Sequence, residues 1–220
     1  SYQVAKKKGW SNVYAANSSL QALGHAYYRF GDYRQAIYFL KASQEFDIPK
    51  TNPGYYYKAQ NSIGLCYQEL AMYDSAITYF ILSHENAAIQ NDSFWMTLTF
   101  GNAGNAYFKT GNLDLAQPFV EADFAGSIKA GEIQSAVNAS GLLANMELKK
   151  GNLEKAGEYL EYAKTHLDTS AKETMVNYYS NLLEYARQSG EDHLALQYAD
   201  SLARYTELRD KYLEKRTLDQ

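Results

Sequence analysis

The stretch Gly104-Asn105-Ala106-Tyr107-Phe108-Lys109-Thr110-Gly111-Asn112-Leu113-Asp114-Leu115-Ala116 decides the fold, because its pattern recurs along the chain. A small residue opens it, an aromatic residue follows three positions later, a turn glycine after seven and an alanine after twelve. A fixed period of this length marks a solenoid of stacked repeats. The five copies begin at Gly24, Gly64, Gly104, Ala144 and Leu183, with spacings of 40, 40, 40 and 39 residues.

Each copy predicts two helices, which we call the first and the second helix of a repeat. Apolar residues recur at helical spacing on both sides of a short turn that carries Gly, Asp or Asn. The small opening residue and the alanine twelve positions later would let the two helix backbones approach closely. The helices are predicted at 11–30 and 33–46, 55–71 and 73–90, 94–110 and 113–130, 133–150 and 153–166, and 172–189 and from 193 onward.

The repeats themselves are predicted at 11–50, 51–90, 91–130, 131–168 and 169–203, with a capping or linker helix at 204–220. Residues 1–8 are predicted to be the end of a helix from a further upstream repeat. Residues 47–54 carry two prolines and are the one predicted flexible joint. Because the chain opens on Ser1 rather than Met, we expect it to be a piece of a longer protein, in the cytoplasm or the periplasm.

Composition and motifs exclude several classes of function. The formal net charge of −4 argues against a nucleic-acid surface, which needs a clustered basic face. The single cysteine, Cys66, permits no intrachain disulfide and is predicted to be a buried thiol. The four histidines lie at unrelated points of different repeats, so no metal site is predicted. With no phosphate-binding glycine loop and no nucleophile beside a base, we expect neither an enzyme nor a cofactor.

The repeat resembles the tetratricopeptide repeat (TPR), a helix–turn–helix unit with small, aromatic, glycine and alanine residues at fixed places. The resemblance covers nearly the whole chain, although the fourth and fifth copies carry Glu147 and Ala186 where Tyr is expected. The longer unit looks like the TPR arrays of bacterial signalling proteins and kinesin light chains. The resemblance implies an all-α, right-handed α-α superhelix of five repeats that ends in an extended helix.

In TPR arrays the first helices line a concave groove, so the resemblance implies a peptide-binding site on these helices. Asn recurs in four of the five repeats, and the pair Asn105 and Lys109 is repeated as Asn145 and Lys149. An Asn side chain can hold an extended peptide backbone, because it offers both a donor and an acceptor, and Lys can bind a carboxylate. The predicted groove residues are His25, Tyr28, Arg29, Lys58, Asn61, Asn105, Lys109, Asn138, Asn145, Lys149 and Asn177.

Two interpretations of the last helix stay open. Tyr198, Tyr205 and Tyr212 are spaced by seven residues, which allows a coiled coil that pairs two copies or leads into a further domain. A capping helix with a polar outer face fits equally well. The favoured function is a non-catalytic scaffold for a protein or peptide partner. The alternative is an input domain of a larger bacterial signalling protein, either a sensor histidine kinase or a transcriptional regulator.

Overall fold

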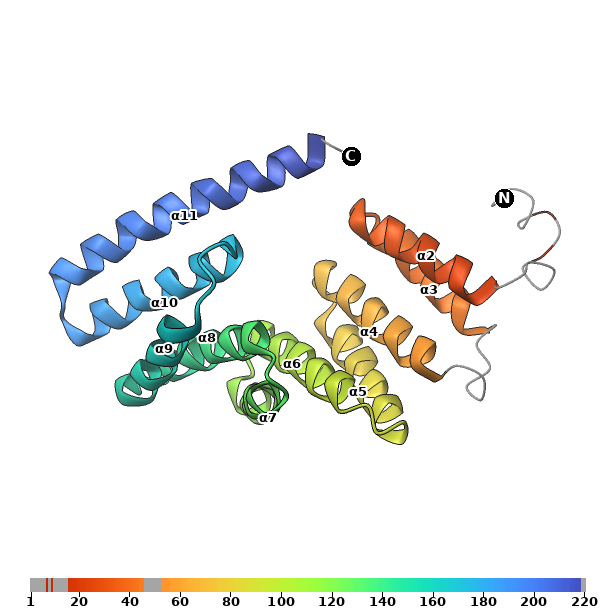
Figure 1. Cartoon of the computed structure of the whole chain (residues 1–220), viewed down its shortest axis with the longest axis horizontal. Helices are drawn as coiled ribbons and strands as arrows, with labels where there is room; N and C mark the ends of the chain where they lie inside the picture. The colour runs from red at the N-terminus through yellow and green to blue at the C-terminus, as the bar shows by residue number, and fades with distance from the viewer. Residues whose placement is uncertain (1–6, 8, 10–15, 46–52, 219–220) are drawn as a thin grey trace. The chain divides into compact units, whose positions relative to one another are not determined.

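The computed structural model of the chain describes residues 7, 9, 16–45 and 53–218 (Figure 1). The described residues form helices joined by short turns, with no strand among them. The fold is therefore all-α, as predicted. The helices are α2 (Ala16–Arg29), α3 (Tyr33–Glu45), α4 (Pro53–Glu69), α5 (Tyr73–Ile89), α6 (Ser93–Lys109), α7 (Leu113–Ala130), α8 (Ile133–Lys149), α9 (Leu153–His166), α10 (Lys172–Ser189) and α11 (Asp192–Leu218).

Over the described residues, the predicted helix ends agree with the structure to within about two residues, the usual uncertainty of a helix boundary. Two predictions fall partly outside this range. Most of the helix end proposed for residues 1–8 and most of the joint at 47–54 lie on residues that the structure does not describe. Pro53 and Gly54 begin α4 instead of belonging to the joint, because proline suits the first turn of a helix.

The chain divides into two compact units, residues 1–119 and 120–220, with the boundary inside α7. In the first unit α2 packs on α3, α3 on α4, α4 on α5 and α5 on α6. In the second unit α8 packs on α9, α10 packs on both of them, and α11 covers α10. Within each unit a helix contacts chiefly its neighbours along the chain, which is the contact pattern of a repeat stack.

The small residues of the repeat lie where paired helices touch. Ala36, Ala76 and Ala156 on the second helices are completely buried. A Cβ atom added at Gly24 would lie 2.6 Å from Leu40 Cγ, and one added at Gly64 would lie 2.6 Å from Phe80 Cε1. Because real carbon atoms do not approach so closely, these two glycines are required by the packing and not by the backbone angles.

The turn between the two helices has the same backbone conformation in every repeat. Gly31, Gly111, Gly151 and Gly190 have φ between 73° and 82°, in the left-handed region, and Ala71 holds the same place with φ of 55°. The N–H of the next residue donates to the carbonyl five positions earlier, for example Met72 to Tyr67 at 2.8 Å. This bond and the left-handed residue before it form a Schellman motif, which satisfies carbonyls at the helix end.

The close approach at Gly64 can be tested with Gly141 as a matched control. Both glycines lie inside a first helix, but a Cβ at Gly141 would meet only Asn181 Nδ2, at 3.9 Å. Gly141→Ala should therefore stabilise the chain by up to ~1 kcal/mol through helix propensity. Gly64→Ala should destabilise it by ~1–3 kcal/mol, because the fully buried Phe80 must move. Urea unfolding followed by circular dichroism measures both, and equal shifts would contradict the assigned packing.

Ala71 gives a test of the turn. A left-handed conformation costs a residue with a Cβ roughly 1–2 kcal/mol, and glycine avoids this cost. Part of the gain is lost because glycine makes the unfolded chain more flexible. Ala71→Gly should therefore raise the free energy of unfolding by ~0.5–1 kcal/mol, and Gly151→Ala at the equivalent turn should lower it. Thermal melts of the two variants should move in opposite directions; movement in the same direction would argue against a shared turn.

Candidate functional site

The predicted groove residues of the first unit lie on α2, α4 and α6, and several of them join neighbouring helices. Asn102 Nδ2 donates to Asn61 Oδ1 at 2.8 Å, which connects α6 with α4. Gln21 Nε2 donates to the carbonyl of Tyr55 at 3.1 Å, and so connects α2 with α4. Asn61 is 4% exposed, so its carboxamide lies inside this connection.

His25 makes a further connection between α2 and α4. Its Nε2 lies 3.1 Å from Ser62 Oγ, and that hydroxyl donates its own proton to the carbonyl of Lys58 at 3.0 Å. Because Ser62 has one proton to give, His25 Nε2 must be the donor in the contact between them. Burial and the nearby Arg29 charge lower the pKa of His25, so the neutral ring with a proton on Nε2 is favoured.

In the second unit the asparagines join α8 and α10. Asn145 Nδ2 donates to Asn181 Oδ1 at 2.8 Å, and Asn181 Nδ2 donates to the carbonyl of Gly141 at 2.7 Å. Asn138 Oδ1 accepts from the hydroxyl of Thr174 at 3.1 Å. These polar contacts, each across 36 or 40 positions of sequence, therefore connect two successive first helices.

These contacts divide the predicted groove residues into two groups. Asn61, Asn138 and Asn145 bond to the next first helix, and the Oδ1 atom of Asn145 is buried without a partner among the described residues. Asn105 and Asn177 form no hydrogen bond with any described side chain or backbone group, so their carboxamides keep both donor and acceptor. The sequence did not reveal the partners Ser62, Asn102, Thr174 and Asn181, since each is a common polar residue on a helix surface.

The charged and aromatic members of the predicted site have different surroundings from those of the asparagines. Arg29, Lys109 and Lys149 are exposed and occupy the same place in three repeats, five positions after the small residue. Lys58 is also exposed, but its Nζ lies 5.5 Å from the centre of the Trp95 ring, a cation–π contact with α6. Tyr28 packs edge-on against Tyr33, and burial with the Glu69 charge raises the pKa of Tyr28 to about 12. Tyr28 is therefore neutral at physiological pH.

The one thiol of the chain is not available as a nucleophile. Cys66 is completely buried, and burial raises the pKa of its thiol to about 12, so the thiolate needed for nucleophilic attack does not form. Among residues 16–45 and 53–218, no three His, Cys, Asp or Glu side chains come together as metal ligands would. In the same ranges, every helix is too short or too polar to cross a membrane.

Comparison with solved structures identifies the architecture. BtubC from P. vanneervenii superposes with a TM-score of 0.73 at 12% identity, covering 95% of this chain and 86% of that chain. The TPR-like repeats of a putative kinesin light chain from Podosopora anserina give 0.66 at 17% identity, covering 86% and 94%. The Rap conjugation gene regulator of plasmid pLS20, in complex with the Phr* peptide, gives 0.64 at 16% identity, covering 87% of this chain and 56% of that chain.

The fold is that of the tetratricopeptide repeat. At these identities the likeness shows the fold alone, and this chain spans about half the length of the Rap regulator. In sequence, no protein-family pattern and no curated protein matches the chain. The resemblance to TPR proteins that the residues indicated is confirmed at the level of the fold.

The hydrogen bond between Asn61 and Asn102 gives a test of the first group of residues. A double-mutant cycle with Asn61→Ala and Asn102→Ala should show a coupling of ~0.5–1.5 kcal/mol in the free energy of unfolding, measured in urea. Asn105→Ala is the control, because Asn105 lies on the same helix as Asn102 without such a bond, and it should cost less than ~0.5 kcal/mol. Zero coupling would show that the asparagines do not join the repeats.

Proposed function

We propose that this chain is a non-catalytic scaffold that binds a peptide or protein segment through exposed polar side chains of its first helices. The residues proposed to contact the partner are those not used between repeats: Asn105 and Lys109 on α6 of the first unit and, as a separate contact, Asn177 on α10 of the second unit. Support comes first from their exposure. Lys109 and Asn177 are exposed and Asn105 is partly exposed, so all three can meet a ligand.

The single observation that carries the proposal is the repeated basic residue. Arg29, Lys109 and Lys149 are exposed at one register position, although the chain as a whole has a net charge of −4. A structural need for a cation there is not evident, because the second repeat places Glu69 at the same position. Lys109, one helical turn after the unpaired carboxamide of Asn105, suits a segment with acidic side chains whose backbone that carboxamide would hold.

A solved relative in fold supports a peptide as the ligand class. The Rap regulator, which has the same kind of repeat, was solved in complex with the Phr* peptide. We carry over from it only the class of ligand. The scaffold proposal extends to Tyr28 and Arg29 on α2, whereas His25 and Lys58 already contact Ser62 of α4 and Trp95 of α6 and so join neighbouring first helices. Asn61, Asn138 and Asn145 have the different role of holding the first helices in register.

The alternative function is a regulatory input domain of a larger signalling protein, in which α11 would contact a neighbouring domain or a second copy of the chain. One observation favours it: Leu208 and Leu213 on α11 are 39% and 47% exposed. The tyrosines of the heptad pattern do not add to this surface. Tyr198 and Tyr205 pack on Tyr179 of α10, and the Lys172 ammonium lies 5.6 Å from the centre of the Tyr212 ring.

The test begins with a random peptide display library selected against the whole chain. Selected peptides should be rich in Asp and Glu, and Lys109→Glu should weaken their binding at least about tenfold through charge repulsion. Asn105→Ala should weaken it about fivefold or more, because the bound peptide loses a hydrogen-bonding partner. Titration calorimetry gives each affinity, and thermal melts should show both variants folded.

Lys155→Glu is the matched control, since Lys155 is an exposed lysine on the second helix α9 and lies outside the proposed surface. Its affinity for the selected peptides should stay within about twofold of the parent chain. If Lys109→Glu left the affinity unchanged while Leu208→Glu on α11 removed binding, the scaffold proposal would be wrong and the input-domain alternative would stand.

A further inference from the structure

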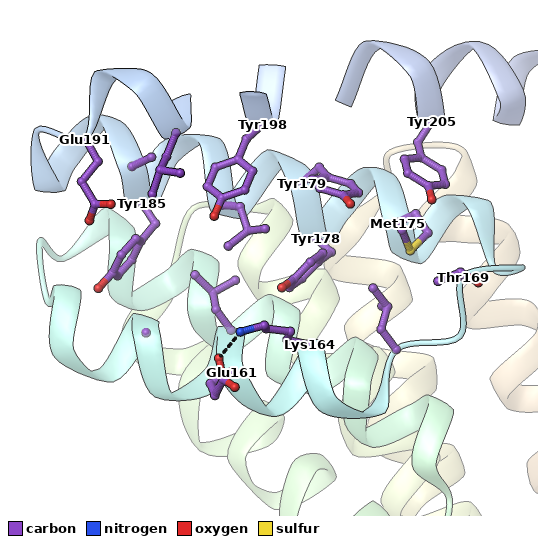
Figure 2. A pocket seen from close by; sticks show the side chains of 16 residues that line it. Glu161, Lys164, Thr169, Met175, Tyr178, Tyr179, Tyr185, Glu191, Tyr198 and Tyr205 are labelled. Carbon is purple, nitrogen blue, oxygen red and sulfur yellow. Dashed lines mark hydrogen bonds and ion pairs between the residues drawn. The ribbon is translucent and has the colours of Figure 1, made fainter. Parts of the chain in front are cut away.

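A pocket of about 560 Å³ lies between α9, α10 and α11, within the second unit (Figure 2). Five tyrosines line it together with leucines and Met175: Tyr178, Tyr179 and Tyr185 come from α10, and Tyr198 and Tyr205 from α11. We call it the tyrosine pocket. Its volume is that of a typical small-ligand site. None of the residues proposed above to hold a peptide is among those that line it.

The pocket is bounded by packed tyrosine rings of α10 and α11 on one side and by α9 on the other. Tyr179 stacks on Tyr205, with ring centres 5.3 Å apart and an interplanar angle of 17°, and its ring centre lies 6.4 Å from that of Tyr198. On the opposite side, α9 presents Gly157, and a Cβ there would lie 3.3 Å from the Tyr185 hydroxyl. The missing side chain therefore leaves the space into which Tyr185 points.

The phenol oxygens of the pocket have no hydrogen-bond partner in the part of the chain that the structure describes. Figure 2 shows the hydroxyls of Tyr178, Tyr185 and Tyr198 on the side of the rings that faces α9. Burial raises the pKa of Tyr178 to about 12, so its hydroxyl stays neutral and able to accept or donate. The pocket thus combines ring faces with uncommitted oxygen atoms.

The charges at the rim favour a cation. Lys164 Nζ lies 3.2 Å from Glu161 Oε2, so these two opposite charges are paired with each other. Glu191 is the third charged residue of the lining, and its Oε1 accepts only a hydroxyl bond from Ser189 at 3.2 Å. The rim therefore carries one net negative charge, which attracts a cation and repels a carboxylate.

Two other kinds of occupant fit less well. An aliphatic side chain would bury the phenol oxygens and leave them without partners, which is costly. A carboxylate would meet the negative rim, because the one lysine is already paired. A guanidinium group avoids both the unpaired phenol oxygens and the charge repulsion. It is planar and stacks on aromatic rings, and its five N–H groups can donate to phenol and carboxylate oxygens.

We propose that the tyrosine pocket binds the arginine side chain of a partner polypeptide. The guanidinium would lie against the Tyr179 and Tyr198 rings, with its N–H groups directed to the phenol oxygens and toward Glu191. The site is independent of the basic surface on the first helices, so a partner could use either one alone. The expected affinity for an isolated arginine is low, with Kd in the millimolar range, because a single stacked cation provides little binding free energy.

The probe is the peptide acetyl-Ala-Arg-Ala-amide, compared with the same peptide carrying citrulline, a neutral group of the same shape. The whole chain is titrated, and binding is followed by the NMR shifts of the arginine side-chain protons, which the tyrosine ring currents should move upfield. The arginine peptide should bind at least about tenfold more tightly than the citrulline peptide. Equal binding of the two peptides, or no binding of the arginine peptide up to 20–50 mM (roughly the weak limit for one cation–π contact), would overturn the proposal.

Variants locate the site. Tyr198→Leu should remove the upfield shift, whereas Tyr198→Phe keeps the ring and should lose only about two- to fivefold in affinity. Glu191→Gln, at an exposed position where folding is not at risk, should weaken arginine binding about threefold and leave citrulline unaffected. Tyr212→Leu is the matched control, because Tyr212 lies on α11 outside the pocket and is 53% exposed. Loss of binding in Tyr212→Leu but not in Tyr198→Leu would place the arginine elsewhere and contradict the proposal.

The outcome is distinguishable from that of the scaffold proposal. Lys109→Glu changes the first-helix surface of the other unit and should leave arginine binding within about twofold, while Glu191→Gln should leave the acidic peptides unaffected. If Glu191→Gln left arginine binding unchanged, the charge argument for the pocket would fail, whatever the result for Lys109.

Discussion

The close approach of the two helices in a repeat is the constraint on which the rest of the structure depends. At Gly64 the backbone of α4 lies against the buried Phe80 ring of α5, and at Gly24 the backbone of α2 lies against Leu40. Because the helices are so close, the turn between them must be short, and the left-handed residue with its Schellman bonds provides it. The small residue, the short turn and the buried alanine thus all follow from the close approach of the two helices.

A second kind of contact decides how neighbouring repeats align. Apolar packing within a repeat is non-directional, and it leaves the register between neighbouring first helices loosely defined. The hydrogen bonds of Asn61 with Asn102 and of Asn145 with Asn181 are directional, and they leave a buried amide unpaired if the helices slide. These bonds therefore favour one register over its neighbours, in addition to any stability they provide.

The sequence predicted the fold well because the close-packing requirement uses few residue types at a fixed period. Gly64, Ala76 and the turn at Ala71 could be assigned from spacing alone, and the structure confirms their helices and burial.

The candidate site was harder to predict. Asn145 is bonded to Asn181, which lies 36 residues away, whereas the repeat advances by about 40, so the period does not pair them. From the recurrence of asparagine we predicted ligand binding, but several of these asparagines form hydrogen bonds between neighbouring repeats. The tyrosine pocket was not predictable from the sequence, because it depends on a contact between Gly157 of the fourth repeat and Tyr185 of the fifth.

The same contacts limit where a ligand can be recognised. Asn181 donates to Gly141, accepts from Asn145 and is 3% exposed, so a ligand could reach its carboxamide only by opening the bonds between the two helices. Such a ligand would gain one hydrogen bond and lose another, and the net binding free energy would be small. Recognition therefore favours groups that the stack does not use: the carboxamide of Asn105, the ammonium of Lys109 and the phenols of the tyrosine pocket. In a repeat protein of this kind, residues that recur most regularly tend to hold the repeats together. Specific binding is then expected from side chains that keep an uncommitted polar group among the described residues, such as Lys109 and the tyrosines of the fifth repeat.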